Sequence, residues 1–129
     1  MDLIPNSTQV PNILLDLIFP FLRDSERSVL LYICRRTYGF QRESDKISLS
    51  QFVGGIQHSE GYPLDFGCGV GHAKVIEGLR MLEALGLVEK VAGSGRGHIN
   101  EYRLNLHAEI GQKVTILQHA ENAREKIGQ

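Results

Sequence analysis

The side chains best suited to chemistry lie close together near the middle of the chain. An imidazole, an ammonium, a carboxylate and a guanidinium follow one another at helical spacing, on His72, Lys74, Glu77 and Arg80. Lysine donates to guanine O6 or N7, and glutamate accepts from cytosine N4. The pattern therefore predicts a helix face that contacts duplex DNA, in which Arg80 grips phosphate and Ala73 lies among the base-contacting residues. A solvated helix face without a ligand remains the alternative reading.

A second set of contacts is predicted at a glycine-rich turn further along. Arg96 has glycines on both sides, and His98 follows at the start of an expected strand. An arginine on such a tip can enter the minor groove or bind phosphate. The alternative is a mobile turn whose arginine only maintains solubility.

Other chemistries find little support in the sequence. The glycine run 67–71 has His72 where a dinucleotide fingerprint needs glycine, and the run 93–97 lacks the lysine of a phosphate loop. The spacing of His58, Cys68 and His72 matches no zinc pattern. Because Ser, His and Asp are scattered without a nucleophile motif, we expect no enzyme, no cofactor and no metal.

The central element is a helix followed at once by a β-hairpin. An apolar stripe of Val75, Leu79 and Leu82 at i, i+4 and i+7 predicts an amphipathic helix between Gly71 and Gly86. Gly71 suits its N-cap, and Gly86 suits a left-handed C-cap. Strands are expected at 87–92 and 98–104. In the second strand, Tyr102 and Leu104 share one face, and Glu101 and Arg103 share the other.

Three further helices are expected before this unit. The first opens at Pro11 and ends or kinks at Pro20. The second begins with Asp24 as N-cap, ends near Thr37 with Gly39 closing it, and has a buried Cys34. The core face of this second helix is expected to contain Leu30, Ile33, Cys34 and Thr37.

A strand at 46–48 leads into the third helix, which has a capping box of Ser48 and Gln51. It should extend to Ile56 and bury Leu49, Phe52, Val53 and Ile56. An insert at 57–69 is then expected, packed by Tyr62, Leu64 and Phe66 and lying beside the central helix. A weakly amphipathic helix is predicted at 108–127.

Length, composition and charge predict the domain organisation and the fold class. The chain has 129 residues, 42% of them hydrophobic, and a formal net charge of −1. This predicts a winged-helix domain at 1–106, with the 57–69 insert, and a tail helix at 107–129. The fold class is mainly α with a small β-hairpin (α+β), a winged helix-turn-helix. Two cysteines, no signal-peptide pattern and an apolar run, 13–22, too short for a bilayer predict a cytoplasmic protein without membrane contact.

Three motifs carry a family resemblance. Residues 8–12 (TQVPN), 35–40 (RRTYGF) and 45–51 (DKISLSQ) make the chain resemble the N-terminal domain of bacteriophage replication protein O over roughly residues 7–106. The resemblance implies a winged-helix domain that binds repeated sites in a phage or prophage replication origin. It also implies dimers and contact with a replicative helicase or its loader.

The sequence leaves competing functions open. Origin binding in DNA replication initiation is the leading expectation. A winged-helix transcriptional regulator uses the same docking chemistry. A winged helix for protein–protein contact without DNA is also compatible with the near-neutral charge and with Glu77. The crowded apolar residues of 13–22 and a stripe in the tail helix of Ile110, Val114 and Leu117 predict a homodimer held by the first and last helices. The alternatives are burial within one domain and a tail that folds back over the first helix of its own chain.

Overall fold

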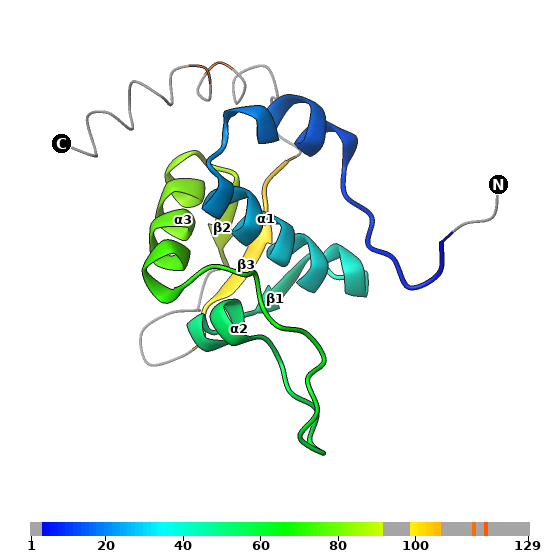
Figure 1. Cartoon of the computed structure of the whole chain (residues 1–129). Coiled ribbons are helices and arrows are strands. Elements are labelled where there is room, and N and C mark those ends of the chain that lie inside the picture. The colour runs from blue at the N-terminus through cyan, green and yellow to red at the C-terminus, as the bar shows by residue number, and fades with distance from the viewer. Residues whose placement is uncertain (1–3, 92–98, 107–114, 116–117, 119–129) are drawn as a thin grey trace.

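Helices and a small antiparallel sheet form the described part of the molecule. The computed structural model describes residues 4–91 and 99–106, together with Thr115 and Gln118. Apart from Thr115 and Gln118, which are helical, the predicted tail helix lies outside the described residues, and so does the tip of the predicted hairpin. The described elements are η1 (Leu14–Ile18), η2 (Phe19–Phe21), α1 (Asp24–Arg36), η3 (Tyr38–Phe40), β1 (Ser44–Lys46), α2 (Leu49–Gly54), α3 (His72–Ala84), β2 (Val88–Lys90) and β3 (Glu101–Leu104). Figure 1 shows the three α-helices beside the sheet.

The sheet joins a strand from the first half of the chain to the two strands after α3. Its order is β1-β3-β2, and both pairings are antiparallel. Tyr102 at the centre of the sheet pairs with Asp45 on one side and with Lys90 on the other. The expected alternation in the last strand is confirmed, since Tyr102 and Leu104 are buried and Arg103 is exposed.

Three strand boundaries differ from those predicted. β1 spans 44–46 instead of 46–48, because Lys46 pairs with Glu101, the first residue of β3, and the ladder ends there. β2 covers 88–90 within the expected 87–92, and β3 begins at Glu101 instead of residue 98. A short strand forms ladder hydrogen bonds only where a partner strand lies opposite it. The hydrophobic pattern of one segment therefore overestimates the length of its strand.

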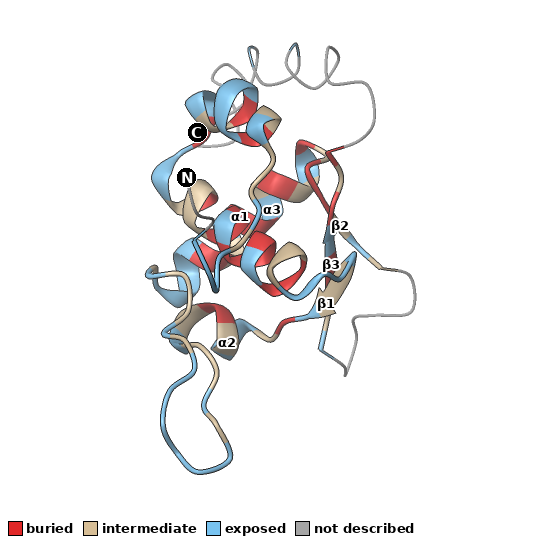
Figure 2. Cartoon of the chain, turned by 90° about the vertical axis from the view of Figure 1, so that its right-hand side faces the viewer, coloured by how far each residue is buried: buried red, intermediate tan, exposed pale blue. Residues whose placement is uncertain are grey.

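The core forms between α1, α3 and the sheet. The predicted core face of α1 is confirmed: Leu30, Ile33, Cys34 and Thr37 are all fully buried. Phe52 from α2 is buried as well, with its ring centroid 5.5 Å from that of Tyr32 and 5.7 Å from that of Tyr102. Figure 2 shows the buried residues concentrated where the helices face one another and the sheet.

Burial of Cys34 gives a testable pH dependence. Desolvation raises the pKa of the Cys34 thiol from 9.0 to about 12. A thiol whose pKa is raised on folding stabilises the fold fully below its unfolded value, and that contribution is lost as pH rises from 9 toward 12. We therefore expect the free energy of unfolding, measured in urea at a series of alkaline pH values, to fall over this range. The fall should be smaller in Cys34→Ala, and an identical slope would contradict the assignment.

The first helical segment departs from a regular α-helix. It continues from Leu14 as a π-helical turn and then as a 3₁₀ turn that contains Pro20. Proline lacks the N–H that would continue the ladder. Leu14, Ile18 and Leu22 enter the core, whereas Leu15, Leu17 and Phe21 are 46%, 42% and 36% exposed.

Both ends of α1 differ from the sequence prediction. Arg23, not Asp24, is the N-cap, and its N–H donates to Glu26 Oε1 at 3.0 Å. At the other end Gln41, not Gly39, adopts the left-handed conformation. Gly39 instead allows the side chains of Thr8 and Arg35 to lie close to the backbone. A Cβ at this position would lie 2.8 Å from Thr8 Oγ1 and 2.7 Å from Arg35 Nη1. The first two motifs of the family resemblance therefore meet at this glycine.

The capping box of α2 is confirmed, but the rest of that helix was predicted too long. The Gln51 N–H donates to Ser48 Oγ at 3.1 Å, and the Ser48 N–H donates to Gln51 Oε1 at 3.2 Å. The helix ends at Gly54, before the expected Ile56, because Gly55 takes a positive φ of 82°. Leu49 is 37% exposed and not buried, since it lies in the first turn at the surface.

The predicted packing of the insert is wrong. Tyr62, Leu64 and Phe66 are 50%, 60% and 78% exposed. The insert also extends past α2, away from the helical body, and not along α3 (Figures 1 and 2). Backbone hydrogen bonds and one carboxylate hold it instead, as described below.

Candidate nucleic-acid interface

The apolar stripe of α3 fixes this helix against α1. Val75, Leu79 and Leu82 are buried, as predicted. Gly78 is buried too, and a Cβ built there would lie 3.3 Å from Val29 Cγ2 and 3.6 Å from the Ser25 carbonyl. The two helices therefore come close at Gly78, and the opposite face of α3 is turned outward.

Both predicted ends of this helix are confirmed. Gly71 is the N-cap, and Gly86 adopts a left-handed φ of 73°. The Gly86 N–H donates to the Glu83 carbonyl at 3.0 Å, and the Leu87 N–H donates to the Leu82 carbonyl at 3.0 Å. This pair of bonds is the Schellman arrangement, which stops the helix and directs the chain into β2.

The outer face of α3 carries the predicted contact residues. All are exposed and in one helix, and they comprise His72, Ala73, Lys74, Glu77 and Arg80. Lys74 Nζ lies 3.4 Å from Glu77 Oε2, and both side chains are 65% exposed. An exposed pair of this kind contributes little stability, so Lys74 can exchange its partner for a base edge or a phosphate, and Glu77 can exchange its partner for a donor on a base edge.

The described lysine and arginine of the two strands after α3 are paired with carboxylates of the protein. Lys90 Nζ lies 3.8 Å from Glu83 Oε1, and Arg103 Nη2 lies 2.8 Å from Glu89 Oε2. Arg80 forms no ion pair with any residue in the described ranges. Arg80 is therefore the cation on α3 that is most available to an incoming anion.

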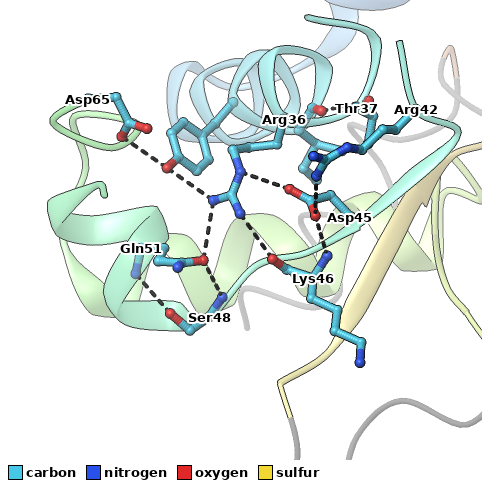
Figure 3. Close-up of polar contacts among 10 residues, drawn as sticks. Arg36, Thr37, Arg42, Asp45, Lys46, Ser48, Gln51 and Asp65 are labelled. Carbon is cyan, nitrogen blue, oxygen red and sulfur yellow. Dashed lines mark hydrogen bonds and ion pairs between the residues drawn. The ribbon is translucent and has the colours of Figure 1, made fainter. Parts of the chain in front are cut away.

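A buried arginine at the end of α1 joins the elements beneath this face. Arg36 is 6% exposed, and its Nε donates to Asp45 Oδ2 at 2.9 Å. Its Nη1 donates to Gln51 Oε1 at 3.2 Å and to the Tyr32 hydroxyl at 3.4 Å, and its Nη2 donates to the Lys46 carbonyl at 3.0 Å. Figure 3 shows this guanidinium surrounded by acceptors from α1, β1 and α2.

The same network reaches the insert. The Tyr32 hydroxyl donates to Asp65 Oδ1 at 3.0 Å, and that oxygen also accepts from the Gly67 N–H at 2.8 Å (Figure 3). Burial raises the pKa of the Tyr32 hydroxyl above its ordinary value of 10.0, which extends the pH range over which it donates to Asp65. The chain runs from Gly67 directly into the N-cap of α3, so this carboxylate positions the segment that leads into the candidate interface.

Sequence reasoning missed the Arg36 network. In the sequence, Arg36 is noted only as part of the 35–40 motif of the family resemblance, and no buried partner is predicted for it. Helical spacing could have identified Arg36 as a core-facing residue. It lies four residues after Tyr32 and three after Ile33, and both of these are buried. An arginine on the core face of a helix indicates a buried carboxylate or carbonyl partner.

Arg96 and His98 lie outside the described residues, so the second predicted contact set has no described geometry. Among the described residues, no three His, Cys, Asp or Glu side chains gather as a metal site. No helix in the same ranges combines the length and the apolar character needed to cross a bilayer. Comparisons with protein-family models, with curated proteins and with solved structures found no match to this chain.

Proposed function

We propose that this chain is a winged-helix domain that binds double-stranded DNA sequence-specifically, with α3 in the major groove. The outer face of α3 carries the proposal: His72, Lys74, Glu77 and Arg80 project from one rigid helix that is packed on α1 and ended by a Schellman turn. Residues early in such a helix reach base edges, and a residue one turn later reaches phosphate.

The topology supports the same proposal. The described order is α1, β1, α2, α3, β2, β3, with β3 between the other two strands. This order is compatible with the proposed winged helix, in which α2 and α3 would form the helix-turn-helix and the segment between β2 and β3 would be the wing. The long insert between α2 and α3 is a departure from the usual short turn.

The resemblance to bacteriophage replication protein O favours repeated sites in a replication origin as the target. A transcriptional regulator with the same docking geometry is the alternative within DNA binding. Selecting bound sequences from random duplex DNA, then locating the recovered motif relative to origins and promoters, separates the two. Recovery of no motif would contradict DNA binding and favour a protein-contact module.

Lys74→Ala is expected to weaken binding to the selected site by about 1–3 kcal/mol and to relax preference at one base position. Arg80→Ala should weaken binding to all sequences about equally, because a phosphate contact carries no base information. Fluorescence anisotropy with specific and scrambled duplexes measures both effects. Arg35→Ala is the matched control, since Arg35 is exposed at the far end of α1. Equal affinities for all three variants and the parent would exclude this face.

We further propose that the protein is a homodimer. The motivation is the apolar surface left on the first helical segment, where Leu15, Leu17 and Phe21 remain exposed. A two-fold pairing would cover this surface and present two α3 helices to two half-sites. Light scattering without DNA should give twice the chain mass, and Leu15→Ser combined with Leu17→Ser should give the mass of one chain, 14.4 kDa. A parent protein of that single-chain mass would overturn the dimer.

A further inference from the structure

The base of the insert is built to hold a fixed shape. The Cys68 N–H donates to the Phe52 carbonyl at 2.8 Å, and the Leu64 N–H donates to the Ile56 carbonyl at 2.8 Å. Together with the Asp65 bonds to Tyr32 and Gly67, these contacts tie the outgoing and returning strands of the insert to α2 and α1. The insert therefore begins and ends on the rigid part of the molecule.

The tip of the insert is ordered as well. The His58 N–H donates to the Tyr62 carbonyl at 2.8 Å, and the Gly61 N–H donates to the His58 carbonyl at 2.8 Å. The rings of His58 and Tyr62 stack at 4.5 Å with an interplanar angle of 9°. Gln57 and Pro63 form a bridge just below. A tip with this many local bonds loses little conformational entropy when a partner binds.

This ordered projection exposes apolar side chains that the fold does not use. Tyr62, Leu64 and Phe66 are half to more than three quarters exposed and lie within five consecutive residues. Figure 2 shows the tip as a surface-exposed arm beyond α2. Exposed apolar side chains on an ordered projection lower the solubility of the protein and do not stabilise its fold. Such exposure is typical of a binding surface.

The charge of the insert indicates what it binds. Between residues 57 and 70 there is no lysine or arginine. Glu60 is an exposed carboxylate, and the second carboxylate, Asp65, accepts hydrogen bonds from Tyr32 and Gly67 at the base. DNA binding by apolar wedges relies on neighbouring cations that neutralise phosphate. An acidic apolar tip would be repelled by a phosphate backbone and would instead complement a basic protein surface.

We propose that the insert docks, through residues 58–66, into a partner protein that presents an apolar pocket rimmed by lysine or arginine. Leu64 and Phe66 enter the pocket, and Glu60 faces the cationic rim. This site lies past α2, and its use does not depend on DNA binding by α3.

The test uses the full chain and a defined probe. Disulfide-constrained random peptides displayed on phage are selected on the immobilised protein, and an enriched peptide is synthesised for anisotropy measurements. We expect enriched peptides that combine aromatic or aliphatic residues with lysine or arginine. Leu64→Ser combined with Phe66→Ser should weaken binding by about tenfold or more, as loss of anchor side chains does. The matched control is Ile4→Ser combined with Leu31→Ser, two exposed apolar positions outside the insert, which should bind like the parent.

Charge reversal tests the second half of the proposal. Glu60→Lys should weaken peptide binding several-fold at low salt, and the difference should shrink at high salt. Glu43→Lys, an exposed acidic position outside the insert, should bind the peptide like the parent. Peptides that bind the Leu64/Phe66 double variant as well as the parent would overturn the proposal. Loss of duplex DNA affinity in that double variant would assign the tip to DNA, and a change in its molecular mass would assign it to a second copy, so either result also overturns it.

Discussion

Replacing Arg36 by methionine is expected to lower the free energy of unfolding by about 3–5 kcal/mol, the usual cost of removing one partner from a buried ionic network. Methionine keeps the apolar stem but removes every donor. Asp45, Gln51 and the Lys46 carbonyl would then each lose a bond that the guanidinium supplies. Urea unfolding followed by circular dichroism measures the loss.

The neighbouring arginine provides the matched control. Arg35 lies on the same helix but is exposed, with its Cζ 4.4 Å from the centroid of the Phe40 ring. Arg35→Met should cost less than about 1 kcal/mol, as exposed cation–π contacts do. Arg36→Lys should restore only part of the stability, because an ammonium cannot reproduce the planar fork that reaches four acceptors. Equal losses at positions 35 and 36 would show that the network contributes nothing beyond helix charge.

Replacing Gly55 by alanine is expected to destabilise the protein by about 3 kcal/mol or more, combining backbone strain with a steric clash. Gly55 has φ 82° and ψ −165°, a conformation that essentially only glycine adopts. A Cβ there would lie 2.0 Å from the Asp65 carbonyl oxygen and 2.5 Å from Asp65 Oδ1. The clash can be relieved only by moving the base of the insert, so urea unfolding should report a lower stability.

Gly61 separates the two causes of this effect. It has a φ of 97°, but no atom lies within 4 Å of a Cβ built there. Gly61→Ala should therefore show strain alone, about 1–2 kcal/mol. If the Gly55 and Gly61 variants are equally stable, contact with Asp65 does not hold the base of the insert. A Gly55→Ala protein that stays folded should also bind duplex DNA more weakly, because the insert leads into α3.

Local signals in the sequence were sufficient for α3 with both of its ends and for the start of α2, but not for the ends of α1 or the end of α2. The stripe of Val75, Leu79 and Leu82 and the flanking glycines predicted α3 with both ends, and Ser48 with Gln51 predicted the start of α2. These features depend on residues within one or two turns of each other, where spacing alone fixes which side chains meet.

The conformation of the insert could not be predicted from local sequence patterns. Aromatic residues in a glycine-rich loop were expected to pack inward, yet Phe66 is 78% exposed. The loop is held instead by Asp65, whose partner Tyr32 lies 33 positions earlier in the chain. No local sequence pattern around Asp65 or Tyr32 predicts that these two residues are hydrogen-bond partners.

The sequence by itself determined the helix-then-hairpin order, the buried and exposed faces of α3, and the residues on its outer face, because helical and strand periodicities are local properties of the backbone. Only the tertiary structure decided that β1 pairs beside β3, that Arg36 is the buried centre of the network, and that the insert projects outward. These features arise from contacts between residues far apart in the chain, where burial and hydrogen bonding are satisfied together. Periodicity carries no information about which distant partner satisfies a buried donor.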